Sequence, residues 1–121
     1  MDSVIDYINQ VKKSVDDMYS DIFNTSGEEM LKNGGCYEFV KIMQNKFVGS
    51  KMYLRFDSNH CAVLIDDILY DVEGVIKNKE DYHEAKQKEI DYMEENAGRD
   101  YKVLHISENF LNSKNNKGKS K

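Results

Sequence analysis

The sequence predicts an α+β fold in which helices pack on a small antiparallel sheet of about four strands. Apolar residues recur with a helical period over residues 4–23, 36–47 and 78–96. Alternating runs of strand-forming residues occupy 52–56, 60–65, 68–72 and 101–106. The order helix, helix, three strands, helix, strand differs from the regular βαβ alternation of a parallel sheet. An antiparallel sheet with helices on one side is therefore the simplest packing.

The first helix is predicted over residues 4–23. Its apolar residues lie about 3.6 positions apart, and Asp2 or Ser3 is available as an N-cap. One further helical turn is expected at 28–32, before the Asn-Gly-Gly break at 33–35. The chain thus opens with an amphipathic helix and a short second one.

The next helix is predicted to begin at or beside Cys36. Its apolar side chains share one face, formed by Phe39, Val40, Met43 and Phe47. The first turn of a helix has unpaired backbone N–H groups and a positive dipole end, which favour a thiolate and can stabilise an oxyanion. These features favour Cys36 as a nucleophile. The alternative is that Gly-Gly is only a turn and that Cys36 is a small core residue.

The hairpin that follows brings a histidine and an aspartate together. With Asp66-Asp67 as a two-residue turn, Glu73 lies opposite His60. Because side chains alternate along a strand, His60 and Asp71 project to the same face as diagonal neighbours, roughly 7 to 8 Å apart at the backbone. Asp71 would then hold one ring nitrogen and stabilise the imidazolium, and Glu73 is the rival orienting residue. The alternatives are a surface histidine at a strand entry and a solvated aspartate.

The last part of the chain is predicted to contain a charged helix, a strand and a basic tail. The helix covers 78–96 and the strand 101–106, with a short helical turn near Phe110. Residues 112–121 contain four lysines, no acidic residue and no apolar residue, which predicts a disordered tail. A single domain is therefore predicted over residues 1–111.

Composition and charge restrict the class of protein. Hydrophobic residues make up 40% and charged residues 32%, as in ordinary folded domains. Without the tail, 13 of the 17 basic residues remain against 22 acidic ones, a charge of −9. This charge argues against a nucleic-acid partner, because phosphate contacts need clustered Lys and Arg. The sequence has no apolar run of about 18 residues and no signal-peptide pattern, so a cytoplasmic protein without a membrane segment is expected.

The remaining cysteine and histidines are weaker candidates. Cys61 follows His60 and therefore points to the opposite face of the sheet, toward the core. His83 is expected to be exposed on the charged helix, and His105 is a spare base without a predicted partner. These residues lack the paired short spacings of a zinc site, and no phosphate loop or Rossmann motif occurs. Neither a metal nor a cofactor is therefore expected.

Residues 34–74 resemble the papain-like superfamily, especially compact transglutaminase-like and small bacterial or phage cysteine hydrolases. The shared pattern is Gly-Gly-Cys-Tyr-Glu-Phe at a helix start, His-Cys-Ala-Val-Leu-Ile on a strand and Leu-Tyr-Asp-Val-Glu-Gly after a tight turn. By this resemblance Cys36 is the nucleophile, His60 the base and Asp71 the orienting residue. No tryptophan follows the cysteine or the histidine, and no glutamine precedes the cysteine to complete an oxyanion hole. Asn33 is the candidate replacement for that glutamine.

The resemblance implies a cysteine-dependent amide hydrolase or acyl transferase that acts on a protein or peptide through a thioester on Cys36. Peptidase, deamidase and transglutaminase-like activities share this first half-reaction. The alternative is a catalytically silent papain-like protein that binds and inhibits a partner, such as a phage-encoded anti-defence factor. Eight tyrosines and the acidic body support that alternative. A homo-oligomeric structural protein is a third class, suggested only by the apolar face of the first helix.

Overall fold

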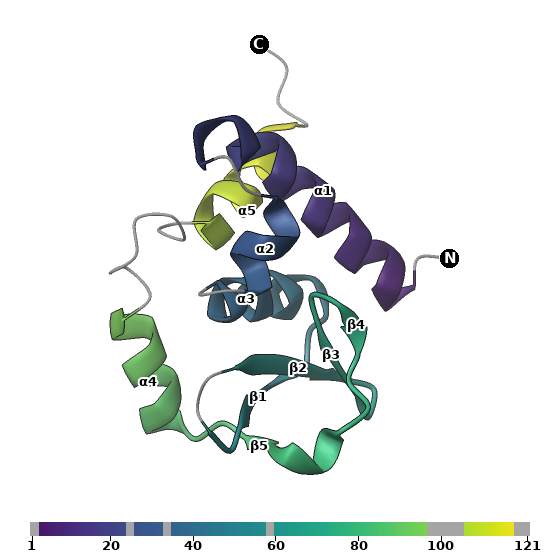
Figure 1. The fold of residues 1–121 in the computed structure, drawn as a ribbon, viewed down its shortest axis with the longest axis vertical. Coiled ribbons are helices and arrows are strands. Elements are labelled where there is room, and N and C mark those ends of the chain that lie inside the picture. The colour runs from purple at the N-terminus through teal and green to yellow at the C-terminus, as the bar shows by residue number, and fades with distance from the viewer. Residues whose placement is uncertain (1–2, 24–25, 33–34, 58–59, 97–105, 118–121) are drawn as a thin grey trace.

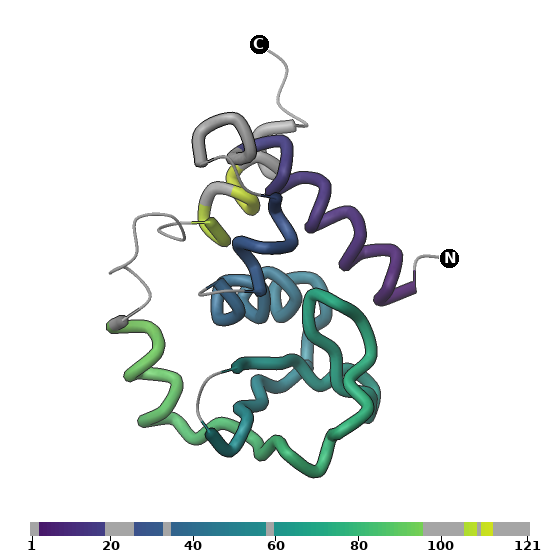
Figure 2. The backbone as a smooth tube through the Cα atoms, in the orientation of Figure 1, coloured from purple at the N-terminus to yellow at the C-terminus, as the bar shows by residue number. Residues whose placement is uncertain are grey.

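The computed structural model describes residues 3–23, 26–32, 35–57, 60–96 and 106–117 (Figure 1, Figure 2). Most of the helices gather on one side of a five-stranded antiparallel sheet, as Figure 1 shows. This arrangement confirms the predicted α+β class.

The first three helices agree with the predicted periodic segments. They are α1 (Val4–Phe23), α2 (Gly27–Lys32) and α3 (Cys36–Lys46). The hydroxyl of Ser3 accepts a hydrogen bond from the backbone N–H of Asp6 at 3.0 Å, which confirms Ser3 as the N-cap of α1. The apolar face of α1 is buried through Tyr7, Ile8, Val11 and Val15.

The sheet has the strand order β4-β3-β2-β1-β5. The strands are β1 (Lys51–Arg55), β2 (Cys61–Ile65), β3 (Ile68–Asp71), β4 (Gly74–Val75) and β5 (Tyr82–Glu84). The first three match the predicted strands to within one residue at each end. The short edge strands β4 and β5 were not predicted, so the expected count of about four becomes five.

The β2–β3 hairpin has the register that the sequence predicts. Val63 pairs with Tyr70 and Ile65 with Ile68, so the turn consists of two residues, Asp66 and Asp67. Both have positive φ angles, 50° and 67°. A two-residue turn with two left-handed residues matches the right-handed twist of the strands it joins, and aspartate tolerates this conformation better than most residues.

The helix predicted over 78–96 is wrong in its first half. Residues Lys79–Asp81 form a 3₁₀ turn, Tyr82–Glu84 form β5, and only Gln87–Asn96 form a helix, α4. The reason is that β5 pairs with β1 and buries Tyr82, and this tertiary pairing outweighs the helical propensity of the charged residues. Helix α4 starts where the Glu89 carboxylate accepts the backbone N–H of Lys86 at 2.8 Å.

The last helix, α5 (Ile106–Lys117), also differs from the prediction. The strand predicted over 101–106 lies outside the described residues up to 105, and Ile106 is the first residue of α5. The helix continues through residues 112–117, where the sequence predicts a disordered tail. Its buried residues Ile106 and Phe110 join the core, and α5 contacts α1 and α3.

A second, smaller apolar cluster covers the sheet face opposite the helices. Ala62, Leu69 and Tyr82 are buried there, with Ile76 packed against them. Because β4 and β5 lie at opposite edges of the sheet, residues 76–81 connect one edge to the other, and Figure 2 traces this connection. Both faces of the sheet are therefore packed.

None of the helices within the described ranges combines the length and apolar character needed to cross a lipid bilayer.

Candidate functional site

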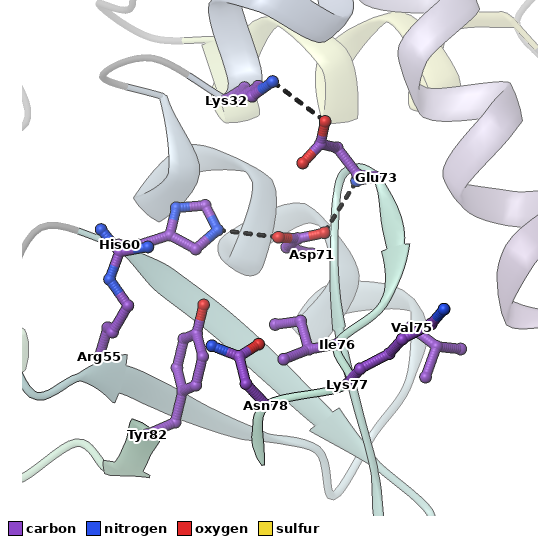
Figure 3. A pocket seen from close by; sticks show the side chains of 10 residues that line it. All are labelled: Lys32, Arg55, His60, Asp71, Glu73, Val75, Ile76, Lys77, Asn78 and Tyr82. Atoms are coloured by element: carbon purple, nitrogen blue, oxygen red, sulfur yellow. Dashed lines mark hydrogen bonds and ion pairs between the residues drawn. The ribbon is translucent and has the colours of Figure 1, made fainter. Parts of the chain in front are cut away.

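The hairpin brings His60 and Asp71 together, as its register predicts. His60 immediately precedes β2, and Asp71 ends β3. The ring nitrogen Nε2 of His60 lies 3.0 Å from Oδ2 of Asp71, and only 12% and 16% of the two side chains is exposed. Oδ1 of Asp71 accepts the backbone N–H of Glu73 at 2.9 Å. Both carboxylate oxygens are therefore engaged, which fixes the orientation of the imidazole (Figure 3).

The structure does not place Glu73 as the rival orienting residue. β3 ends at Asp71, and the chain turns through Val72 and Glu73 into β4, so Glu73 leaves the strand instead of facing His60. Its carboxylate forms an ion pair with Nζ of Lys32 at 3.0 Å. Asn33, the candidate oxyanion donor, lies outside the described residues.

Cys36 is the first residue of α3, with Gly35 as the N-cap residue. Close packing explains why residue 35 is a glycine, because a Cβ at this position would overlap the carbonyl oxygen of Met30 in α2. The sulfur of Cys36 accepts the backbone N–H of Cys61 at 3.3 Å. The contact of Gly35 with α2 and the hydrogen bond from the start of β2 thus position Cys36.

The electrostatics of this cluster favour a thiolate beside an imidazolium. Hydrogen bonding from the Cys61 thiol, the largest cause, and interactions with His60 and with the Cys61 backbone lower the pKa of Cys36, against an opposing effect of burial. The hydrogen bond to Asp71, followed by that to Cys36, raises the pKa of His60 to about 9. Both shifts favour the thiolate of Cys36 and the imidazolium of His60 at neutral pH.

Cys61 has the predicted place in the core, and only 3% of the residue is exposed. The interaction of its thiol with Cys36 was not predicted from the sequence. This hydrogen bond is the largest cause that raises the pKa of the Cys61 thiol. The sequence pattern predicts only that Cys61 faces the core, and the contact with Cys36 depends on how α3 packs on β2.

Helix α4 packs beside the start of α3 and the two cysteines. Sγ of Cys61 lies 3.1 Å from Sδ of Met93. The Tyr37 hydroxyl donates a hydrogen bond to the Glu94 carboxylate, and Nζ of Lys41 lies 3.3 Å from the same oxygen. These contacts tie α4 to α3 on the side of the thiols.

The structure corrects the expectation that His83 is exposed on a helix. His83 lies in β5 and is half-buried, with Nε2 at 3.1 Å from the Glu89 carboxylate and its ring 4.9 Å from that of Phe56. Its Nδ1 has no hydrogen-bond partner among the described residues. His105 lies outside those residues.

A pocket of about 440 Å³ opens beside His60 and Asp71 (Figure 3). The other side chains that line it are Lys32, Arg55, Glu73, Val75, Ile76, Lys77, Asn78 and Tyr82. Cys36 is not among the residues that line it. Within the described ranges, no three His, Cys, Asp or Glu side chains are grouped so that they could hold a metal ion.

Fold and site together define a small α+β protein in which a helix-start cysteine meets a histidine and an aspartate from a β-hairpin. Residues 15–117 match the phage YunG-like protein family, and the chain belongs to this family. Comparisons with curated proteins and with solved structures give no match.

Proposed function

We propose that the protein is a cysteine-dependent amide hydrolase or acyl transferase that forms a thioester on Cys36. One observation carries the proposal: the sulfur of Cys36 accepts a backbone hydrogen bond from Cys61, the residue after His60, and Nε2 of His60 is held by Asp71. These contacts support Cys36 as the nucleophile, His60 as the base and Asp71 as the orienting carboxylate.

In the proposed reaction the Cys36 thiolate attacks the carbonyl carbon of an amide. The backbone N–H groups in the first turn of α3 have no partner within the helix and are positioned to stabilise the oxyanion that develops. When the C–N bond breaks, Nδ1 of His60, the nitrogen not bonded to Asp71, donates its proton to the leaving amine. The product is a thioester on Cys36 and a neutral His60.

The second half-reaction releases the acyl group. Water or an amine attacks the thioester carbonyl and transfers a proton to His60, and the C–S bond breaks to restore the thiolate and the imidazolium. Water gives a carboxylic acid, and an amine gives a new amide. Asp71 keeps the ring in place through both steps.

The test is direct acylation of the protein by p-nitrophenyl acetate. The proposal expects a burst of about one equivalent of p-nitrophenol and an acetyl group mapped to Cys36 by mass spectrometry. The buried Cys61 serves as the internal control and should remain unmodified. Cys36→Ala should abolish the burst and His60→Ala should slow it by about 10² or more. If Cys36 is acetylated no faster than the thiol of a free cysteine peptide, the proposed enzymatic activity is refuted.

The binding-protein alternative is favoured by one observation, namely that Cys36 does not line the pocket. Exposed apolar side chains, 94% for Val48 and 67% each for Phe56 and Tyr92, offer contacts for a partner. Such a protein would inhibit its partner by binding alone, for example as a phage-encoded anti-defence factor. Full biological activity of a Cys36→Ser variant would support this alternative.

A further inference from the structure

The pocket beside His60 collects positive charge in an acidic protein. Lys32, Arg55 and Lys77 line it together with His60, whose raised pKa of about 9 keeps it protonated at neutral pH. Two carboxylates, Asp71 and Glu73, also line it. Four positive groups thus meet two negative ones, whereas residues 1–111 carry a formal charge of −9. The local charge of the pocket is opposite to that of the body around it.

Both carboxylates of the pocket already have partners, whereas, within the described ranges, one of its lysines does not. Asp71 is bonded to His60 and Glu73 to Lys32. Among the described residues, Lys77 forms no ion pair. Lys77 therefore remains available to an anionic ligand, and Arg55 is paired with Asp57, which does not line the pocket.

Arg55 provides the directional donor of the pocket. Its Nε lies 2.9 Å from Oδ1 and 3.1 Å from Oδ2 of Asp57, so the Asp57 contacts use one nitrogen of the guanidinium. In Figure 3 the Arg55 side chain rises beside His60, and the hydroxyl of Tyr82 points toward the same space. A planar guanidinium that shares this space with the Tyr82 hydroxyl is suited to a carboxylate, which a guanidinium binds through two parallel hydrogen bonds.

Size and lining favour a short aliphatic stem on the ligand. A pocket of about 440 Å³ lies within the range that holds small ligands. Val75 and Ile76 provide apolar wall for methylene groups. An aspartate or glutamate side chain combines such a stem with a carboxylate.

From these features we propose that the pocket binds the carboxylate of an acidic residue in a peptide substrate, with Arg55 as the main anchor and Lys77 as a second cation. The inference rests on the proposed function, because it assigns the substrate class of the same site. The amide attacked by Cys36 would then lie next to an aspartate or glutamate.

The experiment measures binding without catalysis. The Cys36→Ala protein is titrated with acetyl-Ala-Glu-Ala-amide and, separately, with acetyl-Ala-Gln-Ala-amide, and the Kd values are obtained from amide shifts of residues 75–78. We expect the glutamate peptide to bind about five- to tenfold more tightly at low salt, and this preference to shrink at 0.3 M salt. Arg55→Gln should remove the preference, Arg55→Lys should restore part of it, and Lys77→Gln should reduce it. Lys88→Gln, an exposed lysine on α4, is the matched control and should leave it unchanged.

Three outcomes would overturn the proposal. Equal Kd values for the two peptides would show that the pocket does not select a carboxylate, and tighter binding of inorganic phosphate would assign it to a phosphoryl group. Recovery of the preference in Arg55→Gln/Asp57→Asn would show that repulsion from Asp57, and not loss of Arg55, caused the effect. Because these titrations use a protein without the thiol, their result is independent of the acylation test.

Discussion

Asp71 orients His60 and favours its protonated form through one short side chain. One of its carboxylate oxygens holds the His60 ring and the other is held by the backbone N–H of Glu73. The hydrogen bond to Asp71 is the largest cause that raises the His60 pKa. The imidazolium that this carboxylate stabilises then favours the Cys36 thiolate.

Asp71→Asn should therefore lower the His60 pKa from about 9 toward its ordinary value of 6.5. The sign follows from charge, because asparagine can accept a hydrogen bond but has no negative charge with which to stabilise the protonated ring. NMR titration of the His60 ring protons measures the shift, with the His83 ring as an internal reference. Alkylation of Cys36 by iodoacetamide reports the consequence for the thiol.

In the wild type, the alkylation rate should stay nearly constant between pH 8 and pH 6, because Cys36 remains ionised. An unperturbed thiol loses about tenfold per pH unit in this range. In Asp71→Asn the rate should fall with decreasing pH. Identical pH profiles in the two proteins would mean that Asp71 does not act on the thiol through His60.

Residue-scale prediction from sequence succeeded where local geometry decides. The His60–Asp71 contact follows from strand alternation and a two-residue turn, both of which are properties of one short segment. The approach of the Cys61 thiol to Cys36 depends on how α3 packs on β2, which no local pattern contains. The prediction that Glu73 lies opposite His60 was wrong, because β3 ends at Asp71 and the next two residues turn the chain into β4.

At the scale of elements, the position of Cys36 depends on the contact between α2 and α3. Gly35→Ala should push the start of α3 away from Met30, since the added Cβ would overlap its carbonyl oxygen. We expect a loss of about 1 to 3 kcal/mol in the free energy of unfolding and slower alkylation of Cys36 in the folded protein. Urea denaturation and the iodoacetamide rate measure the two effects.

Gly49→Ala is the matched control for this substitution. Gly49 has a φ of +91°, so alanine is strained there, but a Cβ would meet no atom within 4 Å. We expect a loss of about 1 kcal/mol in stability and an unchanged alkylation rate. If Gly35→Ala behaves in the same way, the α2–α3 contact does not position the thiol.

The predicted elements were correct where periodicity and burial coincide. Helix α1 and the β2–β3 hairpin carry regular apolar patterns and fold as expected. The 78–96 segment is rich in helix-forming charged residues, yet Tyr82–Glu84 forms a strand that pairs with β1. A strand of three residues leaves too short a pattern to outweigh helical propensity in the sequence.

At the scale of the whole molecule, a buried carboxylate joins residues far apart in the chain. Glu38 in α3 is only 4% exposed, and its Oε1 accepts both the backbone N–H and the hydroxyl of Ser107, each at 2.9 Å. It therefore caps the first turn of α5 from another helix. This cap stabilises the start of α5 at Ile106.

Glu38→Ala should destabilise the protein by about 2 to 3 kcal/mol, because it leaves buried donors at the start of α5 without an acceptor. Ser107→Ala keeps the backbone N–H bond and should cost less, about 1 kcal/mol. Urea denaturation gives both values, and hydrogen exchange should show faster exchange in α5. Unchanged stability and exchange in Glu38→Ala would contradict the capping role.

The two edges of the sheet are a strand of two residues, β4, and one of three residues, β5. Edges this short offer few unpaired backbone groups to another chain, which protects the protein from edge-to-edge aggregation. For the same reason a peptide cannot gain much affinity by adding itself to the sheet as a further strand. Among the described residues, the side chains of the pocket therefore offer more to a peptide than the edges of the sheet do.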